Sequence, residues 1–197
     1  MCPPPPVPER TGAGLIGAGL IGAGLISVVG GESTGKSTLA GALGVRLPAV
    51  VVSEFLRNWV DEHEGCVPGP TEQASVMAAH RQAELSAFRE ADRTGCGWVV
   101  SDSGPLMTAV YSIQYYDDDS LLPRALEWIA DSAGVVWCQD DFPWQADPQR
   151  DGPHARVASQ QILATIFAEH PDLPVLAVRG SPDERIAAVL SAVTDQI

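Results

Sequence analysis

Residues 30–37 read Gly30-Gly31-Glu32-Ser33-Thr34-Gly35-Lys36-Ser37 and match the pattern G-x-x-x-x-G-K-[ST] at every position. Glycine allows backbone N–H groups to wrap around a phosphate with no Cβ atom in the way. A helix that begins at Lys36 adds unpaired N–H groups and the positive end of its dipole. The sequence therefore predicts that Gly30 to Thr38 bind the phosphates of a nucleoside triphosphate.

Two side chains of this loop have specific expected roles. Lys36 is expected to reach the β- and γ-phosphate oxygens, and the Ser37 hydroxyl is expected to ligate Mg²⁺. The alternative is a chance match in a chain with 19 glycines. Against chance, the only lysine of the chain is Lys36, at the one position where the pattern requires it. ATP and Mg²⁺ are therefore the expected cofactors, and the lack of an Asn/Thr-Lys-x-Asp guanine motif favours ATP over GTP.

From Leu25 onward, short apolar runs alternate with longer segments of helical periodicity. The apolar runs show no period-two polarity, which is typical of strands buried on both faces: 25–29, 49–53, 98–101, 135–138 and 175–178. The helical segments are 36–46, 71–93, 106–116, 121–132, 154–170 and 182–193. This alternation predicts an α/β fold of the P-loop NTPase type, a five-stranded parallel sheet flanked by helices.

The first 23 residues differ from the rest in composition. Pro3 to Pro6 form a run of four prolines, and Gly-Ala-Gly-Leu-Ile occurs three times in tandem from Gly12 to Ile26. Prolines favour an extended, solvated chain, and a five-residue period is too short for a solenoid. We therefore predict a disordered N-terminal tail over residues 1–23 and one domain over residues 24–197.

Composition and charge exclude several function classes. The formal net charge is −13, from 12 basic and 25 acidic residues, which argues against a nucleic-acid partner and against a helicase or recombination ATPase. No uninterrupted apolar run reaches the roughly 18 residues of a membrane span. The four cysteines lie far apart without a Cys-x-x-Cys pair, which predicts reduced thiols in a cytoplasmic protein. Oligomeric state is left open.

Two carboxylates follow predicted strands, at the sheet edge where parallel α/β proteins bind ligands. Glu54 comes after the second apolar run and can accept a proton from a hydroxyl that attacks the γ-phosphate. The alternative is that Glu54 is a helix N-terminal carboxylate stabilised by the helix dipole. Asp102 comes after the third run and is the expected acid on the Mg²⁺ side.

A long polar stretch after the fourth apolar run, residues 139–156, is a predicted lid. Arg150 and Arg156 are expected to close on the phosphates and stabilise the transferring charge. Trp144 is expected to stack on a planar ring. The alternative is a surface loop in which the arginines pair with neighbouring aspartates.

Four stretches in order resemble the nicotinamide riboside kinase domain of bacterial bifunctional NAD-biosynthesis regulators and their stand-alone AAA-type relatives. They are residues 28–40, Ser53-Glu54-Phe55-Leu56-Arg57, Ser101-Asp102-Ser103-Gly104-Pro105-Leu106-Met107-Thr108, and Phe142-Pro143-Trp144-Gln145-Ala146-Asp147-Pro148-Gln149-Arg150. The resemblance covers about residues 25–195, and its most specific piece is the Pro-Trp-x-x-Asp-x-x-Arg segment.

The resemblance implies a P-loop kinase that transfers the ATP γ-phosphate to the 5′-hydroxyl of nicotinamide riboside. Lys36 and Ser37 would then hold phosphate and Mg²⁺, with Glu54 and Arg57 on the acceptor side. The resemblance implies a lid formed by Trp144, Asp147 and Arg150.

One departure from the family concerns the third strand. Family members often have Asp-Thr-Asp there, whereas this chain has Asp102-Ser103-Gly104 and lacks the second carboxylate. The sequence carries no His-x-Gly-His nucleotidyltransferase signature, so adenylylating activity is not implied. The leading hypothesis is a small-molecule kinase acting on nicotinamide riboside or a related nucleoside. The alternative is a nucleotide-dependent regulatory switch with a protein partner, which the missing carboxylate favours.

Overall fold

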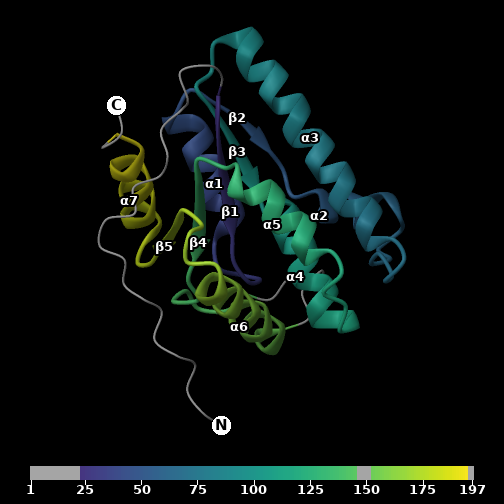
Figure 1. The fold of residues 1–197 in the computed structure, drawn as a ribbon. Helices are drawn as coiled ribbons and strands as arrows, with labels where there is room; N and C mark the ends of the chain where they lie inside the picture. The colour runs from purple at the N-terminus through teal and green to yellow at the C-terminus, as the bar shows by residue number, and fades with distance from the viewer. Residues whose placement is uncertain (1–22, 146–151, 195–197) are drawn as a thin grey trace.

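The computed structural model describes residues 23–145 and 152–194 (Figure 1). Apart from Ala23, the predicted N-terminal tail lies outside the described residues. Among the described helices, none has both the length and the apolar composition needed to cross a lipid bilayer.

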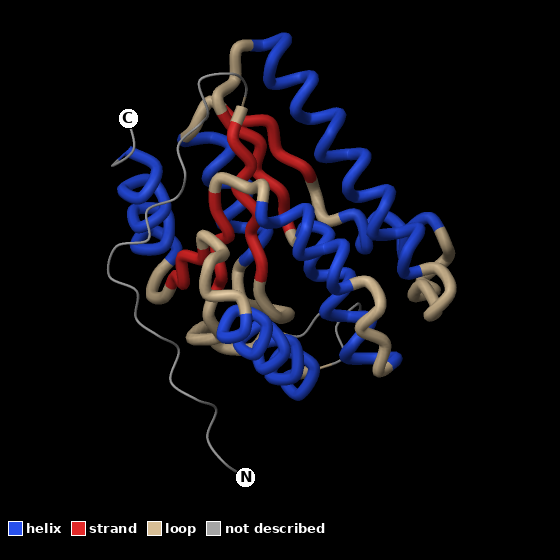
Figure 2. Tube along the Cα trace, viewed as in Figure 1, coloured by secondary structure: helices blue, strands red, loops and turns tan. Residues whose placement is uncertain are grey.

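A parallel five-stranded sheet lies at the centre of the fold, as predicted (Figures 1 and 2). Its strand order is β2-β3-β1-β4-β5. Its strands are β1 (Gly24–Val29), β2 (Ala49–Val52), β3 (Trp98–Asp102), β4 (Gly134–Cys138) and β5 (Val175–Val178). The three central strands are buried along their whole length, and each predicted strand agrees with the observed one to within one residue. The parallel register brings the carboxyl ends of β1, β3 and β4 to one edge of the sheet.

Seven helices connect and cover the described strands. They are α1 (Lys36–Arg46), α2 (Phe55–Glu62), α3 (Gln73–Thr94), α4 (Gly104–Tyr116), α5 (Leu122–Ala130), α6 (Pro153–Glu169) and α7 (Pro182–Thr194). Helix α7 begins with a capping box, in which the Ser181 amide donates to Glu184 Oε2 at 2.7 Å. Helix α2, which has eight residues and buries only Val60, was not among the predicted helices.

The alternating side chains of the strands divide the core between the two faces of the sheet. Ile26 and Val28 of β1 pack with Leu43 of α1 and Val189 of α7 on one face. Val29 packs with residues of α4, α5 and α6 on the other face. Helix α3 covers the β2–β3 side of that second face through Ala87 and Ala91. The helices thereby fix the sheet edge at which the phosphate loop opens.

Candidate functional site

The phosphate loop joins β1 to α1 and needs glycine at two positions. Gly30 has φ +149°, and a Cβ atom there would lie 2.7 Å from the Cys138 carbonyl oxygen. Gly35 has φ +83°, and a Cβ atom there would lie 2.9 Å from the Phe142 ring. Gly35 is also the N-cap of α1, and no described side chain caps that helix. The first N–H groups of α1 are therefore available to bind an anion.

Lys36 lies folded back over this loop. Its side chain is buried, and its Nζ donates a hydrogen bond to the Gly31 carbonyl oxygen at 3.1 Å. Thr34 Oγ1 donates to the same carbonyl oxygen at 2.8 Å. The ammonium charge is thus held within the loop, where it can contact phosphate oxygens.

Two clefts share the phosphate loop. The larger has a volume of about 390 Å³, and the second has about 280 Å³. The larger is lined by residues 32–38 together with Glu54, Leu56, Arg57, Val60, Val67, Pro68, Gln73, Tyr111, Tyr115 and Tyr116. The second is lined by Ser33, Gly35, Thr38, Leu39, Phe142, Pro143, Gln145, Pro182, Arg185 and Ile186. Ser33, Gly35 and Thr38 line both clefts, so the phosphate loop borders each of them.

Asp102 and Ser37 meet at the mouth of the loop and fit a divalent cation. The Ser37 hydroxyl makes a hydrogen bond to the Asp102 carboxylate, whose Oδ1 is buried without a partner among the described residues. Burial raises the pKa of Asp102, while the bond to Ser37 and the charge of Lys36 lower it. A buried carboxylate oxygen beside a hydroxyl is a donor set that suits Mg²⁺, with the other positions left to phosphate oxygens and water.

Glu54 directly precedes α2, and its side chain lines the larger cleft. Its Oε1 accepts a hydrogen bond from Ser103 Oγ at 3.0 Å, and its Oε2 lies 4.0 Å from Arg57 Nε. Its side chain makes no capping bond to α2. The carboxylate therefore contacts residues across the site, while Glu54 is also the N-cap residue of α2, where the helix dipole favours its negative charge.

All three tyrosines of the chain line the larger cleft, a feature that the sequence analysis missed. Tyr111, Tyr115 and Tyr116 lie on α4, and Tyr116 Oη donates to the Pro68 carbonyl oxygen at 2.8 Å. Burial raises the pKa of Tyr111 well above its usual value, and the charge of Glu54 adds to the effect. The spacing i, i+4, i+5 within a helical segment was the signal that could have revealed this aromatic wall.

The missing carboxylate at Gly104 does not open a gap in this cleft. Gly104 has φ +48°, and a Cβ atom there would lie 2.6 Å from Ser27 Oγ and 3.8 Å from Glu84 Oε1. Ser27 and Glu84 are both buried. A side chain at position 104 would therefore point into the protein interior in this backbone conformation.

The described part of the predicted lid rests on the phosphate loop. The Gln145 amide donates to Ser33 Oγ at 3.0 Å, and Arg156 Nη1 donates to the Phe142 carbonyl oxygen at 2.9 Å. The Arg156 guanidinium lies 5.7 Å from the centre of the Trp144 ring. Trp144 and Arg156 are thus brought together, and neither is among the residues lining the two clefts. Asp147 and Arg150 lie outside the described residues.

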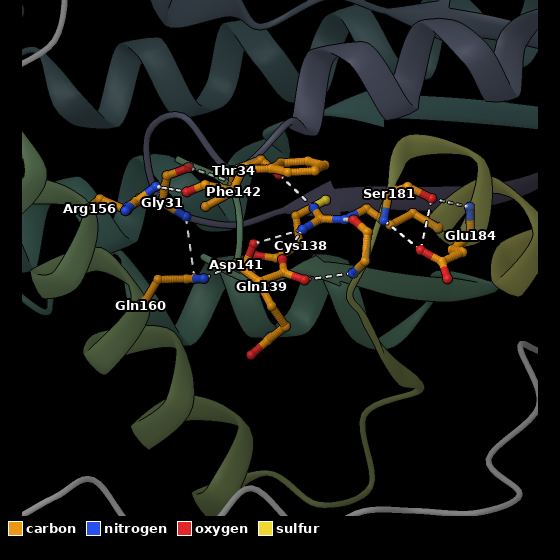
Figure 3. A network of polar contacts seen from close by, with 12 residues as sticks. Gly31, Thr34, Cys138, Gln139, Asp141, Phe142, Arg156, Gln160, Ser181 and Glu184 are labelled. Carbon is orange, nitrogen blue, oxygen red and sulfur yellow. Dashed lines mark hydrogen bonds and ion pairs between the residues drawn. The ribbon is translucent and has the colours of Figure 1, made fainter. Parts of the chain in front are cut away.

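Arg185, which the sequence analysis also missed, connects the loop to the base of the lid. Its buried guanidinium donates to the carbonyl oxygens of Thr34 at 2.6 Å and Gln139 at 3.1 Å. It also pairs with the Asp141 carboxylate and lies 4.0 Å from the centre of the Phe142 ring. Figure 3 labels four of these partners, Thr34, Gln139, Asp141 and Phe142, beside Gly31, Arg156 and Gln160. Arg185 therefore fixes the phosphate loop to the segment that follows β4.

A second buried polar network lies behind Asp102. His80 Nε2 is 3.0 Å from Ser101 Oγ, which donates to Glu84 Oε1 at 2.7 Å. Arg81 Nη1 donates to the other Glu84 oxygen at 2.9 Å. Burial lowers the pKa of His80 from 6.5 to about 4, with the charge of Glu54 acting in the opposite direction. Burial also raises the pKa of Glu84.

These opposite shifts predict how stability depends on pH. Neutral His80 contributes stability that is complete above pH 6.5 and is lost as the pH falls toward 4, because the unfolded chain binds the proton first. Glu84 acts in the opposite sense, since its raised pKa favours the folded state as the pH falls. His80→Gln removes only the first contribution. When the pH falls from 7 to 5, we expect the loss of unfolding free energy to be about 2 kcal/mol smaller for His80→Gln than for the wild type.

Urea unfolding of both proteins at pH 7 and pH 5 measures this difference. Equal losses in His80→Gln and the wild type would show that His80 does not cause the acid sensitivity.

Comparisons with solved structures agree with this fold. The chain is similar to thymidylate kinase from Candida albicans, with a TM-score of 0.60, 11% identity, and coverage of 88% of this chain and 92% of that chain. It is similar to the NadR protein solved in complex with NR, with a TM-score of 0.65, 21% identity, and coverage of 88% and 51%. It is also similar to deoxyadenosine kinase from M. mycoides solved with bound dATP, with a TM-score of 0.52, 12% identity, and coverage of 87% and 99%. The chain spans about half the length of the NadR protein.

A comparison by sequence places the chain in a family. A search of curated protein sequences finds no match. A family model described as an AAA domain, in contrast, matches residues 25–185, a range that begins in β1 and ends at Arg185. This range contains the phosphate loop, Glu54, Asp102 and the described part of the lid. The chain therefore belongs to the AAA domain family.

Proposed function

We propose that the protein is an ATP-dependent kinase that phosphorylates the 5′-hydroxyl of nicotinamide riboside or a related nucleoside. The observation that carries the proposal is the larger cleft, which is lined by the phosphate loop, Glu54 and three tyrosines. Tyrosine rings provide flat apolar faces on which a planar base can stack. The NadR protein, solved in complex with NR, is a structural neighbour that supports this acceptor.

The two clefts suggest separate positions for donor and acceptor. The second cleft is bounded by Phe142, Pro143 and Pro182, apolar groups suited to the base of ATP. The larger cleft then takes the acceptor, so that the phosphate loop lies between the two substrates. In the lining of this cleft, the charges of Lys36 and Arg57 are balanced by those of Glu32 and Glu54, and Arg57 Nε lies 4.0 Å from Glu54 Oε2. This charge balance favours an acceptor without a phosphate group over a nucleoside monophosphate.

In the proposed reaction, Glu54 accepts the proton of the acceptor hydroxyl as its oxygen forms a bond to the γ-phosphorus. The bond from the γ-phosphorus to the bridging oxygen breaks, and ADP leaves with that electron pair. Lys36 and the N–H groups of the loop stabilise the negative charge on the phosphate oxygens. Ser37 and Asp102 would hold Mg²⁺, which supplies positive charge beside the same oxygens when bound.

Replacing Glu54 by Gln tests the proposed base. Glu54→Gln keeps the size of the side chain and its contact with Ser103, but it cannot accept the proton. We expect nucleoside-dependent turnover to fall by roughly 10²- to 10³-fold, with the KM for ATP little changed. The assay combines ATP, Mg²⁺ and nicotinamide riboside and measures nicotinamide mononucleotide by mass.

The exposed pair Arg93 and Glu90 supplies a control. Glu90→Gln makes the same chemical change far from the cleft in sequence and should leave turnover unchanged. Full nucleoside-dependent turnover in Glu54→Gln would refute the role of Glu54 as the base. Slow ATP loss in the wild type that no nucleoside accelerates would instead favour the regulatory switch.

A further inference from the structure

The bend that follows β3 places a non-glycine residue in a costly backbone conformation. Ser103 has φ +71° and ψ −28°, a region that residues with a Cβ atom seldom adopt. Such conformations cost on the order of 1–3 kcal/mol and persist where the surroundings enforce them. Here the Ser103 amide donates to the Val28 carbonyl oxygen of β1 at 2.9 Å, and the residue is buried. Glycine would adopt this conformation without the strain.

The Ser103 side chain offers a reason why serine occupies this position. Its Oγ donates to Glu54 Oε1 at 3.0 Å, a contact between residues 49 positions apart in the chain. The single proton of the hydroxyl is used in this bond, so the carboxylate is held at one oxygen. The other oxygen, Oε2, lies 4.0 Å from Arg57 Nε, and both side chains line the larger cleft.

We propose that Ser103 is a positioning residue that orients Glu54 so that Oε2 faces the acceptor hydroxyl. This inference rests on the proposed function, in which Glu54 accepts the proton of that hydroxyl. The strained backbone at Ser103 directs its hydroxyl toward Glu54. The hydrogen bond from the Ser103 amide to the Val28 carbonyl oxygen of β1 stabilises this backbone conformation. Deleting the hydroxyl frees Glu54 to rotate away from the line of proton transfer, while the phosphate loop keeps its contacts.

Two substitutions separate the hydroxyl from the backbone strain. Ser103→Gly and Ser103→Ala both remove the bond to Glu54, but only glycine relieves the strain. We expect both variants to lose about 10- to 100-fold in kcat, with the KM for ATP unchanged. Ser103→Gly should also unfold at the same or a higher urea concentration than the wild type. A purely structural role predicts different kcat values for the two variants and a loss that follows stability.

Ser112→Ala serves as the matched control. Ser112 is a buried serine on α4, and its Oγ has no hydrogen-bond partner among the described residues. Removing this hydroxyl should therefore leave kcat unchanged. The double variant Glu54→Gln/Ser103→Gly completes the set, because Ser103→Gly should cause no further loss once Glu54 cannot act as the base.

The experiment measures nucleoside-dependent turnover, acceptor-independent ATP hydrolysis and urea unfolding for this set. A kcat loss in Ser103→Gly that disappears in the Glu54→Gln background supports the inference. Wild-type kcat in Ser103→Gly overturns it and leaves the proposed function standing. If the wild type shows no nucleoside-dependent turnover, the proposed function fails. The inference, which concerns the acceptor hydroxyl, then fails with it, and this outcome is distinct from wild-type kcat in Ser103→Gly, which overturns the inference alone.

Discussion

Lys36→Ala is expected to lower nucleoside-dependent ATP turnover by about three orders of magnitude. Lys36 is the only lysine of the chain, and its ammonium group is buried within the loop that would hold the β- and γ-phosphates. Removing a preorganised charge from a phosphoryl-transfer site costs roughly 10²- to 10³-fold or more in kcat. Product formation measured by mass reports the loss. Arg46→Ala, which removes an exposed positive charge from the other end of α1, should keep full turnover.

The same lysine allows a binding measurement that does not depend on turnover. An amine-reactive acetylating reagent can modify only Lys36 among the side chains of the chain, because no other lysine is present. ATP with Mg²⁺ should protect Lys36 from acetylation, as read from the mass of the peptide that contains it. Equal acetylation with and without ATP, or full turnover in Lys36→Ala, would contradict the role given to Lys36.

Local patterns were sufficient to predict the strands, six of the helices and the phosphate loop. Five apolar runs without period-two polarity correspond to β1–β5, because strands covered on both faces bury nearly every side chain. Ser37 and Asp102 were each predicted on the Mg²⁺ side, and the structure adds the hydrogen bond between them, at the sheet edge where the phosphate loop and the end of β3 meet. Helix α2 was missed although Phe55, Leu56, Trp59 and Val60 have helical spacing, because a segment of eight residues is too short to distinguish a helix from a loop by periodicity alone.

Contacts between distant residues account for what the sequence did not reveal. The bond from Ser103 to Glu54 depends on a backbone bend whose φ value follows from its anchor on β1. Gly104 illustrates the same limit, because its missing carboxylate mattered only if position 104 faced the cleft. The structure points that position toward Ser27 and Glu84 instead. The residue types predicted the chemistry of the site, whereas the direction in which each side chain points became known only from the folded structure.

Arg185→Met is expected to cause the largest loss of stability. The Arg185 guanidinium is 1% exposed, yet each of its nitrogens has a partner, through Gly180, Thr34, Gln139 and Asp141. Methionine retains much of the side-chain stem but leaves three carbonyl oxygens and the Asp141 carboxylate without this donor. Removing one partner from a buried charge network typically costs about 3–5 kcal/mol of unfolding free energy. Urea unfolding of the wild type and Arg185→Met measures the difference.

Arg124→Met shows whether the loss comes from burial of the charge. Arg124 pairs with Glu127 at 2.9 Å, but both side chains are more than half exposed, so this pair should contribute less than about 1 kcal/mol. Equal unfolding midpoints for the two variants would contradict the structural role given to Arg185. Because Arg185 contacts both the Thr34 carbonyl oxygen and the Phe142 ring, its loss should also loosen the phosphate loop. We therefore expect Arg185→Met to weaken the protection of Lys36 by ATP, even where the variant remains folded.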